Sequence, residues 1–412
     1  MKEKAQVIID DPTVRYDSDQ KKEARNQRAV GEKQMALLTN ESGRQHGNES
    51  EFYVFRYLAA EGFLPGYNFT RLPIRAFVGY KHQDQGEYIS RARFIALREY
   101  GPQNLIYHNG SKYRINRMML PDGELKLQPI KASKQTGYAF LDEETRHFNN
   151  DPITNTELKG DKNAEIHSYL VELNEVEGVP QDRISCEEEE RTSQGFITKQ
   201  FFRYVNGMAS TKQTIIKIGD QPLLRVIYGP STELIQLNQK WKRSQDDGFN
   251  IDKRSGKWLR QSELENELTA ENAKNVMIFA RDWADTLYLQ PVKDLDVNPD
   301  QVYSLAYALK RGIERLFETE ENEIGVWVIG NEESPNILIY EAAEGSLGIL
   351  SQLVEDTLKF RELFIEAYRS LHFDPETKED LRTDLPKASY EDLLSYYNQR
   401  QHDVLNRFSV QS

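Results

Sequence analysis

Between residues 124 and 240 the sequence is divided into short segments that have the composition of β-strands, separated by turn-forming residues. β-branched and aromatic residues favour strands, whereas Gly, Pro, Asn and Asp favour the turns between them. The segments are IHSYLVEL, FITKQFFRYV, QTIIKI, LLRVIYG and TELIQLN. Short strands in succession are typical of a sheet closed into a barrel or sandwich. We therefore expect a β-rich middle region.

The stretch before this region has mixed character. RFIALREY (residues 93–100) is a predicted short helix, and NLIYH and KYRINRM are predicted strands joined at Asn109-Gly110. Asn-Gly between two apolar runs is a strong hairpin signal, because both residues accept the positive φ of a tight turn. The polar stretch KRSQDDGFNIDKRSGKW and the segment ELENELTAENAKN, which follow the middle strands, are predicted to form an exposed insertion.

Helical patterns occur at both ends of the chain. KKEARNQRAVGEKQMALL and SEFYVFRYLAAEGF are predicted N-terminal helices. Near the C-terminus, VMIFARDWADTLYLQPV, IGVWVIG and NILIYEA are predicted strands, and QVYSLAYALKRGIERLF, GSLGILSQLVEDTLKFRELFIEAYRSL and YEDLLSYYNQRQHDVLNRF are predicted helices. The sequence thus predicts an α+β fold with a helical N-terminal segment (1–62), a β-rich domain (63–265) and a small α/β domain (266–412).

Charge is segregated along the chain. The formal net charge is −13, which argues against a protein that coats nucleic acid with its whole surface. Residues 67–117 nevertheless contain nine Lys and Arg against three acids, and residues 141–190 contain fifteen acids against four bases. The first stretch is a candidate basic patch.

Two function classes are excluded by what the sequence lacks. It has no GxxxxGK[ST] phosphate loop and no DEAD or DEAH motif, so no ATPase activity is expected from this chain alone. Its one cysteine, Cys186, excludes a disulfide framework and a site made of several thiolates. No signal peptide or spanning segment is recognisable, and a cytoplasmic protein with no membrane partner is expected.

Three long phrases resemble one family. GFLPGYNFTRLPIRAF and ISRARFIALREYGPQNLIYHNGSKYRIN are similar to a region just beyond the motor domains of large bacterial superfamily 2 DEAD/DEAH-type DNA helicases. LIYEAAEGSLGILSQLVED, followed by YEDLLSYYNQRQHDVLNR, resembles the MrfA-like zinc-binding domain that ends these helicases, including defence helicases of the DISARM kind. The resemblance extends from about residue 44 to residue 407 and implies a C-terminal accessory region of such a helicase.

The zinc cysteines of the family are missing here. The matching positions are Leu371, Leu385, Ser389 and Asp392, and leucine cannot bind zinc. We therefore expect no zinc and no other cofactor. Packing of leucines, with two tyrosines nearby, is expected to replace the metal; the residues are Leu371, Leu385, Leu393, Leu394, Tyr396 and Tyr397.

The resemblance and the basic patch together predict a non-motor accessory region that binds DNA, a helicase ATPase subunit or domain, or both, in bacterial genome maintenance or phage defence. Arginines and lysines would contact phosphates and tyrosines would stack on bases. The candidate DNA-binding residues are Arg71, Arg75, Arg91, Arg93, Arg98, Lys112, Arg114, Tyr67 and Tyr107. No catalytic residue and no metal ligand is predicted.

Other interpretations of the same residues remain open. The basic stretch is also compatible with a solvated face that pairs with the acidic residues 141–190 or with a partner protein. The chain would then be a protein–protein adapter in a defence complex with no DNA contact of its own. A cryptic nuclease built from dispersed acids is a further alternative.

Overall fold

The computed structural model describes residues 2–15, 18, 21, 24, 25, 28, 29, 32, 72–79, 86–181, 195–292, 298–331, 333, 335–343 and 347–411. Tyr67, Arg71, Cys186 and the second predicted N-terminal helix lie outside these residues. The described positions of the first predicted helix are helical, and helix α1 (Lys2–Asp10) precedes it. Among the described residues, no helix combines the length and the apolar character needed to cross a bilayer.

The chain forms two sheets with few helices, so the predicted α+β class with a strand-rich middle is confirmed. The smaller sheet has the order β2-β1-β8-β4-β3. Its strands are β1 (Ile74–Gly79), β2 (Gly86–Arg91), β3 (Leu105–His108), β4 (Ser111–Met118) and β8 (Val176–Pro180). Strand β8, from the acidic stretch, lies between β1 and β4 of the basic stretch, parallel to β1 and antiparallel to β4.

The predicted hairpin and short helix of the basic stretch are both present. Strands β3 and β4 pair antiparallel, with φ values of 46° at Asn109 and 71° at Gly110. These values are those of a turn whose twist matches the strands on either side. Helix α4 (Arg93–Glu99) occupies the predicted helical segment, and its Ala96 and Leu97 are fully buried.

The larger, eleven-stranded sheet is organised around two long antiparallel strands, β11 (Gln221–Trp241) and β14 (Ala273–Pro291). The sequence predicted two strands where β11 is one. Pairing with β14 continues across a bulge at Gly229, and Ser231 takes a φ of 49° there. The bulge fits because Gly229 lies against Tyr204, where a Cβ atom would be 2.3 Å from the ring.

The other strands of this sheet are added along the long pair. Strand β11 pairs first with β10 and then with β9, whereas β14 pairs with β7 and β12 near its start and with β16 near its end. The bounds are β5 (Gln128–Ser133), β6 (Ala139–Leu141), β7 (Ala164–Glu172), β9 (Phe196–Tyr204), β10 (Lys212–Ile218), β12 (Phe249–Asp252), β13 (Trp258–Leu259), β15 (Ile324–Ile329) and β16 (Asn336–Glu341). The predicted boundary at 265 therefore falls between strands of one sheet.

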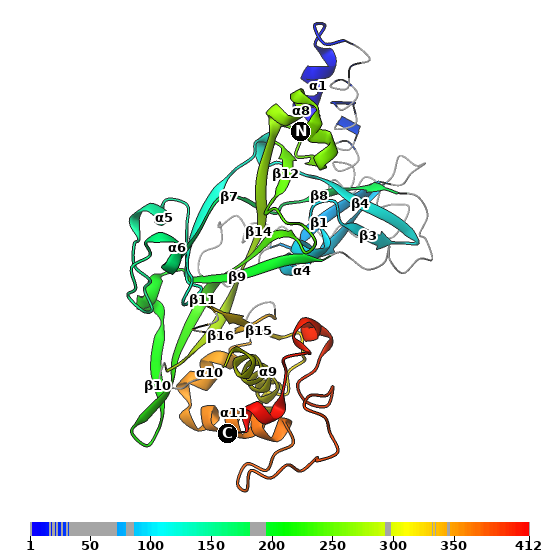
Figure 1. Ribbon diagram of the computed structural model, residues 1–412. Helices are drawn as coiled ribbons and strands as arrows, with labels where there is room; N and C mark the ends of the chain where they lie inside the picture. Colours follow the sequence, from blue (N-terminus) through cyan, green and yellow to red (C-terminus); the bar gives the residue numbers. More distant parts are fainter. Residues whose placement is uncertain are drawn as a thin grey trace.

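Separate cores form at the two ends of the long strands (Figure 1). At one end the smaller sheet packs on β12, β13 and the start of β14. At the other end helices cover β14 and β16. These are α9 (Pro299–Leu316), α10 (Ile349–Glu355) and α11 (Thr357–Ser370), and the short helices elsewhere are α5 (Glu144–His147), α6 (Gly160–Asn163) and α8 (Glu267–Asn272).

Helix α9 contributes many residues to the helical core. Its sequence supplies a cap at its first turn and a small residue on the face that packs against α11. Asn298 caps it by accepting from the backbone N–H of Asp300, and Pro299 occupies the first turn, where no intrahelical N–H is needed. Gly312 lets α11 approach closely, since a Cβ atom there would lie 2.8 Å from the Leu363 carbonyl oxygen.

Two segments differ from the sequence prediction. The polar stretch expected to be an exposed insertion contains Phe249, Ile251 and Trp258, which are at most 5% exposed and belong to the core. Residues 390–408, expected to be helical, form turns and two short 3-10 helices, η4 (Tyr396–Gln401) and η5 (Arg407–Val410). Side chains of Asp392 and Ser395 accept from nearby backbone N–H groups there, which competes with a continuous helix.

Candidate nucleic-acid cleft

A cleft of about 950 Å³ opens where the smaller sheet meets the ends of β11, β12 and β13. Arginines reach it from four different elements: Arg91 ends β2, Arg98 lies in α4, Arg114 in β4, and Arg260 follows β13. Glu99 is the one acidic residue among the described lining residues, and it pairs with Arg91 at 2.8 Å. We call this site the arginine cleft.

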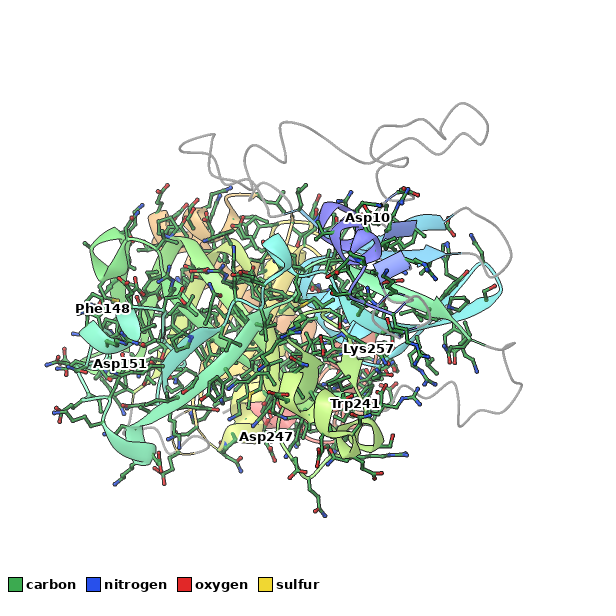
Figure 2. All side chains as sticks on the ribbon, turned by 90° about the horizontal axis from the view of Figure 1, so that it is seen from above. Asp10, Phe148, Asp151, Trp241, Asp247 and Lys257 are labelled. Atoms are coloured by element: carbon green, nitrogen blue, oxygen red, sulfur yellow. The ribbon has the colours of Figure 1, made fainter. Side chains whose placement is uncertain are left out.

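Aromatic residues form part of its wall. Tyr107 of β3 is 40% exposed and lines the cleft. Trp241, the last residue of β11, lines it as well and packs against Phe196 with ring centroids 4.1 Å apart. Figure 2 shows Trp241 on the same side of the molecule as Lys257, far from Phe148 and Asp151. The cleft thus combines positive charge with flat apolar surfaces.

Two side-chain hydrogen bonds connect the elements that form the floor of the cleft. The Tyr100 hydroxyl donates to the Ile89 carbonyl oxygen at 2.6 Å, and burial raises the pKa of this phenol. Gln103 donates to the Trp258 carbonyl oxygen at 2.8 Å and so ties the α4–β3 connection to β13. These bonds join the segment after α4 to β2 and to β13, the elements next to Arg91 and Arg260.

The predicted site residues separate into two groups. Arg91, Arg98, Arg114 and Tyr107 all line the arginine cleft. Lys112 is half-buried on β4 and is not among the lining residues. Tyr67 and Arg71 lie outside the described residues. The sequence interpretation missed Arg260 and Trp241, which lie within or beside the stretch assigned to an exposed insertion.

Arg75 and Arg93 face acidic residues instead. Arg75 pairs with Glu175 and lies 4.8 Å from the centre of the Tyr88 ring. Arg93 pairs with Glu172 at 2.9 Å and donates to the Leu72 carbonyl oxygen. Both partner carboxylates, Glu172 and Glu175, come from the acidic stretch 141–190. Arg75 and Arg93 therefore follow the alternative prediction, in which the basic stretch pairs with this acidic stretch.

Arg93 is one end of a chain of alternating charges. Glu172 also accepts from Arg281, which reaches Glu233 at 3.3 Å, and Glu233 in turn pairs with Arg203. Arg203 completes the chain by pairing with Glu144. Burial lowers the pKa of Arg93, while the carboxylate charge of Glu172 opposes that effect. Every arginine in this series of ion pairs, Arg93, Arg203 and Arg281, pairs with a carboxylate. In the arginine cleft, the described pair is that of Arg91 with Glu99.

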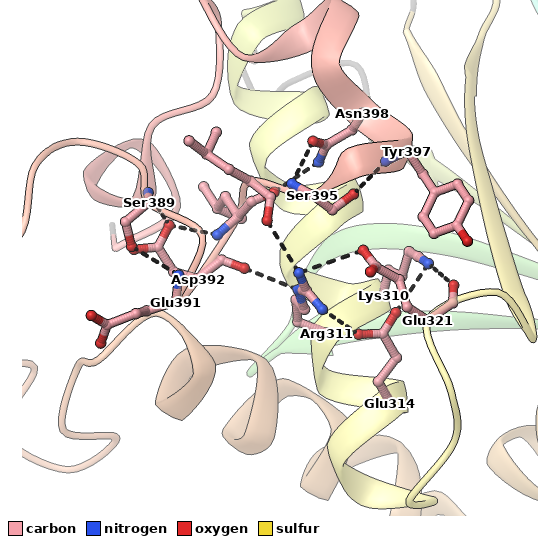
Figure 3. A network of polar contacts seen from close by, with 12 residues as sticks. Lys310, Arg311, Glu314, Glu321, Ser389, Glu391, Asp392, Ser395, Tyr397 and Asn398 are labelled. Carbon is pink, nitrogen blue, oxygen red and sulfur yellow. Dashed lines mark hydrogen bonds and ion pairs between the residues drawn. The ribbon is translucent and has the colours of Figure 1, made fainter.

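The C-terminal segment is fastened to α9 by backbone carbonyl groups (Figure 3). Arg311 donates to the carbonyl oxygens of Asp392 at 3.0 Å and Leu394 at 3.2 Å. Asp392 is 1% exposed, and its carboxylate accepts from the backbone N–H and the hydroxyl of Ser389. The turn from Ser389 to Asp392 is therefore closed by hydrogen bonds.

The residues at the zinc positions do not fit a metal, since Leu371 is fully buried in the core and Leu385 is half-buried. Within the described part of the chain, no group of three or more His, Cys, Asp or Glu is arranged to hold a metal ion. Leu371 and Leu393 pack in the helical core as expected and Leu394 packs against it. Tyr396 and Tyr397 are instead 76% and 64% exposed.

A buried arginine ties this segment together. Arg407 has no exposed surface, and all three of its guanidinium nitrogens donate. They bind Asp380 through both carboxylate oxygens, and the carbonyl oxygens of Leu371, Arg382 and Pro386. The Arg407 guanidinium thus joins three parts of the C-terminal segment, at Leu371, at Asp380 to Arg382 and at Pro386.

No family model matches the chain, and no curated protein matches it. Solved structures titled as the DUF1998 helicase MrfA are similar to it. With MrfA bound to DNA the TM-score is 0.37 at 9% identity, over 92% of this chain and 39% of that chain. With MrfA alone the TM-score is 0.30 at 9% identity, over 81% and 33%. With MrfA bound to DNA and AMPPNP it is 0.27 at 10%, over 75% and 29%. The chain spans less than half the length of these helicase chains.

Proposed function

We propose that this chain is a non-motor accessory region of a DNA helicase system, which binds DNA through the arginine cleft and works with a helicase ATPase in genome maintenance or phage defence. The observation that carries the proposal is the convergence of Arg91, Arg98, Arg114 and Arg260 on one cleft, where Glu99 is the one acid among the described lining residues. The helicase context rests on the long phrases of the sequence that resemble helicase accessory regions.

The local charge of the cleft outweighs the acidic average of the protein for a ligand that enters it. Charges more than about 10 Å away are screened at physiological salt, whereas those lining a cleft act together at short range. Among the described residues, Arg114 and Arg260 are not in an ion pair within 4 Å, although the charge of Arg260 acts on Glu263. Arginine can bind phosphodiester oxygens with two hydrogen bonds at once, because its guanidinium donors match their geometry.

The test is DNA binding by the full chain, measured by fluorescence anisotropy over a range of salt concentrations. Reversing charge in the double variant Arg114→Glu/Arg260→Glu should weaken binding by at least about tenfold and flatten the salt dependence, because fewer counterions are released. Arg146→Glu is the matched control: Arg146 is exposed in α5, next to Phe148 on the far side of the molecule from Trp241 (Figure 2). Equal affinities for the double variant and the unmodified chain would contradict the proposal, as would ATP hydrolysis by the chain unaided.

A second candidate is an adapter that binds the motor and no DNA. It is favoured by β10, an edge strand of the larger sheet, whose Ile215 and Ile218 are 54% and 71% exposed. Exposed apolar residues on an unpaired strand edge are typical of surfaces that receive another chain. Co-purification with a helicase ATPase, abolished by Ile215→Lys and Ile218→Lys, together with no DNA affinity at low salt, would establish this role instead.

A further inference from the structure

Glu99 is the one acid among the described residues that line the arginine cleft, and its carboxylate faces Arg91. Oε2 of Glu99 accepts from Nε of Arg91 at 2.8 Å. Nη1 of the same guanidinium donates to the Ser90 carbonyl oxygen at 3.0 Å. The hydrogen bond with Glu99 raises the pKa of Arg91. A carboxylate of the protein therefore occupies a donor that the proposed function assigns to a DNA phosphate.

Hydrogen bonds outside the ion pair also bring the two residues together. Tyr100, which follows Glu99, donates from its hydroxyl to the carbonyl oxygen of Ile89, two residues before Arg91. This bond joins the end of α4 to β2. Asn104 donates from its side-chain amide to the Glu99 carbonyl oxygen at 2.8 Å. The closeness of Glu99 to Arg91 therefore does not depend on their ion pair alone.

The pair of Arg91 with Glu99 is far more exposed than the buried ion pairs of the protein. The two side chains are 42% and 45% exposed. In the pair of Arg93 with Glu172 the values are 12% and 17%. An ion pair surrounded by water contributes little, whereas separating a buried pair leaves a charge without solvent or counter-ion. A phosphate can therefore displace Glu99 from Arg91 at a low cost in free energy, but not Glu172 from Arg93.

A phosphodiester and a carboxylate compete for the same donors. Each carries one negative charge and offers oxygen acceptors that a guanidinium binds through two of its N–H groups. A phosphate bound to Arg91 would also lie close to the displaced Glu99 carboxylate, and like charges at short range repel. Binding of DNA at Arg91 is therefore opposed both by the loss of the ion pair and by this repulsion.

We propose that Glu99 is an autoinhibitory residue of the arginine cleft, whose carboxylate holds Arg91 until a DNA phosphate displaces it. This inference rests on the proposed function and adds a means of regulating the same site. The other three arginines of the cleft, Arg98, Arg114 and Arg260, would make the first contacts with the ligand. Arg91 joins them only after the exchange of partners, so Glu99 lowers the affinity of the cleft.

The test is a double-mutant cycle on Arg91 and Glu99, in which the full chain binds labelled DNA in the anisotropy assay described above. Glu99→Gln should tighten binding by about threefold, the size of effect that an exposed ion pair allows. Arg91→Gln should weaken binding less in the unmodified chain than in the Glu99→Gln background. The reason is that Glu99 stabilises Arg91 before binding and not afterwards, so the two changes are not additive.

Asp247→Asn is the matched control for the loss of one negative charge. Asp247 pairs with Lys240 at 2.9 Å, and its side chain is 44% exposed, close to the value for Glu99. It directly precedes Gly248, which lines the cleft, but is not itself a lining residue. Asp247→Asn should therefore tighten DNA binding by less than Glu99→Gln does.

The outcomes separate this inference from the proposed function. Equal losses for Arg91→Gln in both backgrounds would show that the ion pair persists in the complex, and competition by Glu99 would be wrong while the proposed function stands. Equal gains for Glu99→Gln and Asp247→Asn would also overturn the competition, since only overall charge would then matter. If neither the unmodified chain nor Glu99→Gln binds DNA, the proposed function itself fails and this inference fails with it. Circular dichroism and thermal melting of each variant identify any that misfold.

Discussion

Arg407 and Asp380 form a two-pronged ion pair, with Nη1 2.8 Å from Oδ1 and Nη2 2.7 Å from Oδ2. Arg407 is fully buried, whereas the Asp380 side chain is 17% exposed. Removing the Asp380 carboxylate leaves the buried Arg407 guanidinium without its counter-ion, and arginine cannot lose its proton to become neutral. Asp380→Asn should therefore lower the free energy of unfolding by about 3 kcal/mol. Arg407→Met leaves an Asp that can be hydrated and should cost less, about 2 kcal/mol. Urea unfolding measures both, and the opposite order would contradict this account.

The double variant Arg407→Met/Asp380→Asn tests whether the two residues act as a pair. Because each single change already breaks the ion pair, the double variant should be less destabilised than the sum of the single variants. Additive losses would show that the carbonyl contacts of Arg407, and not Asp380, hold the segment.

Stability in acid should depend on Glu165. Burial opposes ionisation of this residue, but hydrogen bonds and charge from His167, at 2.7 Å, and Lys199 lower the pKa of Glu165 to about 2 from its ordinary 4.5. The unfolded chain therefore binds this proton first, so the stabilisation is complete above about pH 4.5 and is lost as the pH falls towards about 2. Glu165→Gln should cost about 2 kcal/mol at pH 7, allowing for screening at Lys199, and should flatten the unfolding free energy across that window.

Removing the charge of Glu233, in the middle of the series of ion pairs, should lower the stability of the protein. Glu233 is 1% exposed and lies between Arg203 and Arg281. Glu233→Gln leaves two half-buried guanidinium groups with one carboxylate each, so we expect a loss of about 3 kcal/mol in the free energy of unfolding. Arg382→Gln, which breaks exposed pairs with Asp384 and Glu391, is the control and should change stability little.

The turn between β12 and β13 requires glycine for two separable reasons. Gly256 has a φ of 72°, and a Cβ atom there would lie 2.1 Å from the Met118 carbonyl oxygen. Gly219 has a φ of 59° with nothing within 4 Å. Gly219→Ala therefore reports the backbone cost alone, about 1 kcal/mol, and Gly256→Ala should exceed it by about 2–3 kcal/mol. Equal losses for the two variants in thermal or urea unfolding would show that the Met118 carbonyl group, at the end of β4, can move away from the added Cβ atom at little cost.

Local signals predicted the elements that depend on neighbouring residues. Asn109-Gly110 predicted its hairpin, because the turn chemistry resides in those two residues. LLRVIYG and TELIQLN were predicted as separate strands, but pairing with β14 continues through both, so that they form the single strand β11. The helical pattern after Tyr390 was misleading because Ser389, Asp392 and Ser395 use their side chains to close turns.

The candidate site could be predicted only in part for a similar reason. The arginines of the basic stretch indicate positive charge, but the sequence does not show which of their guanidinium groups form ion pairs with acidic residues. Glu172 and Glu175 reach Arg93 and Arg75 only because the acidic stretch folds back beside β1 and α4. Arg260 lies far along the sequence from Arg98, and only the tertiary fold brings it to the cleft.

Strand β11 extends from the core under helices α9–α11 to Trp241 in the arginine cleft, and it pairs with β14 on both sides of the bulge at Gly229. Unfolding of either end of the molecule would break backbone hydrogen bonds between β11 and β14, the strands that both ends share. A partner that binds the C-terminal helices would therefore be connected to Trp241 in the cleft through a single strand, β11.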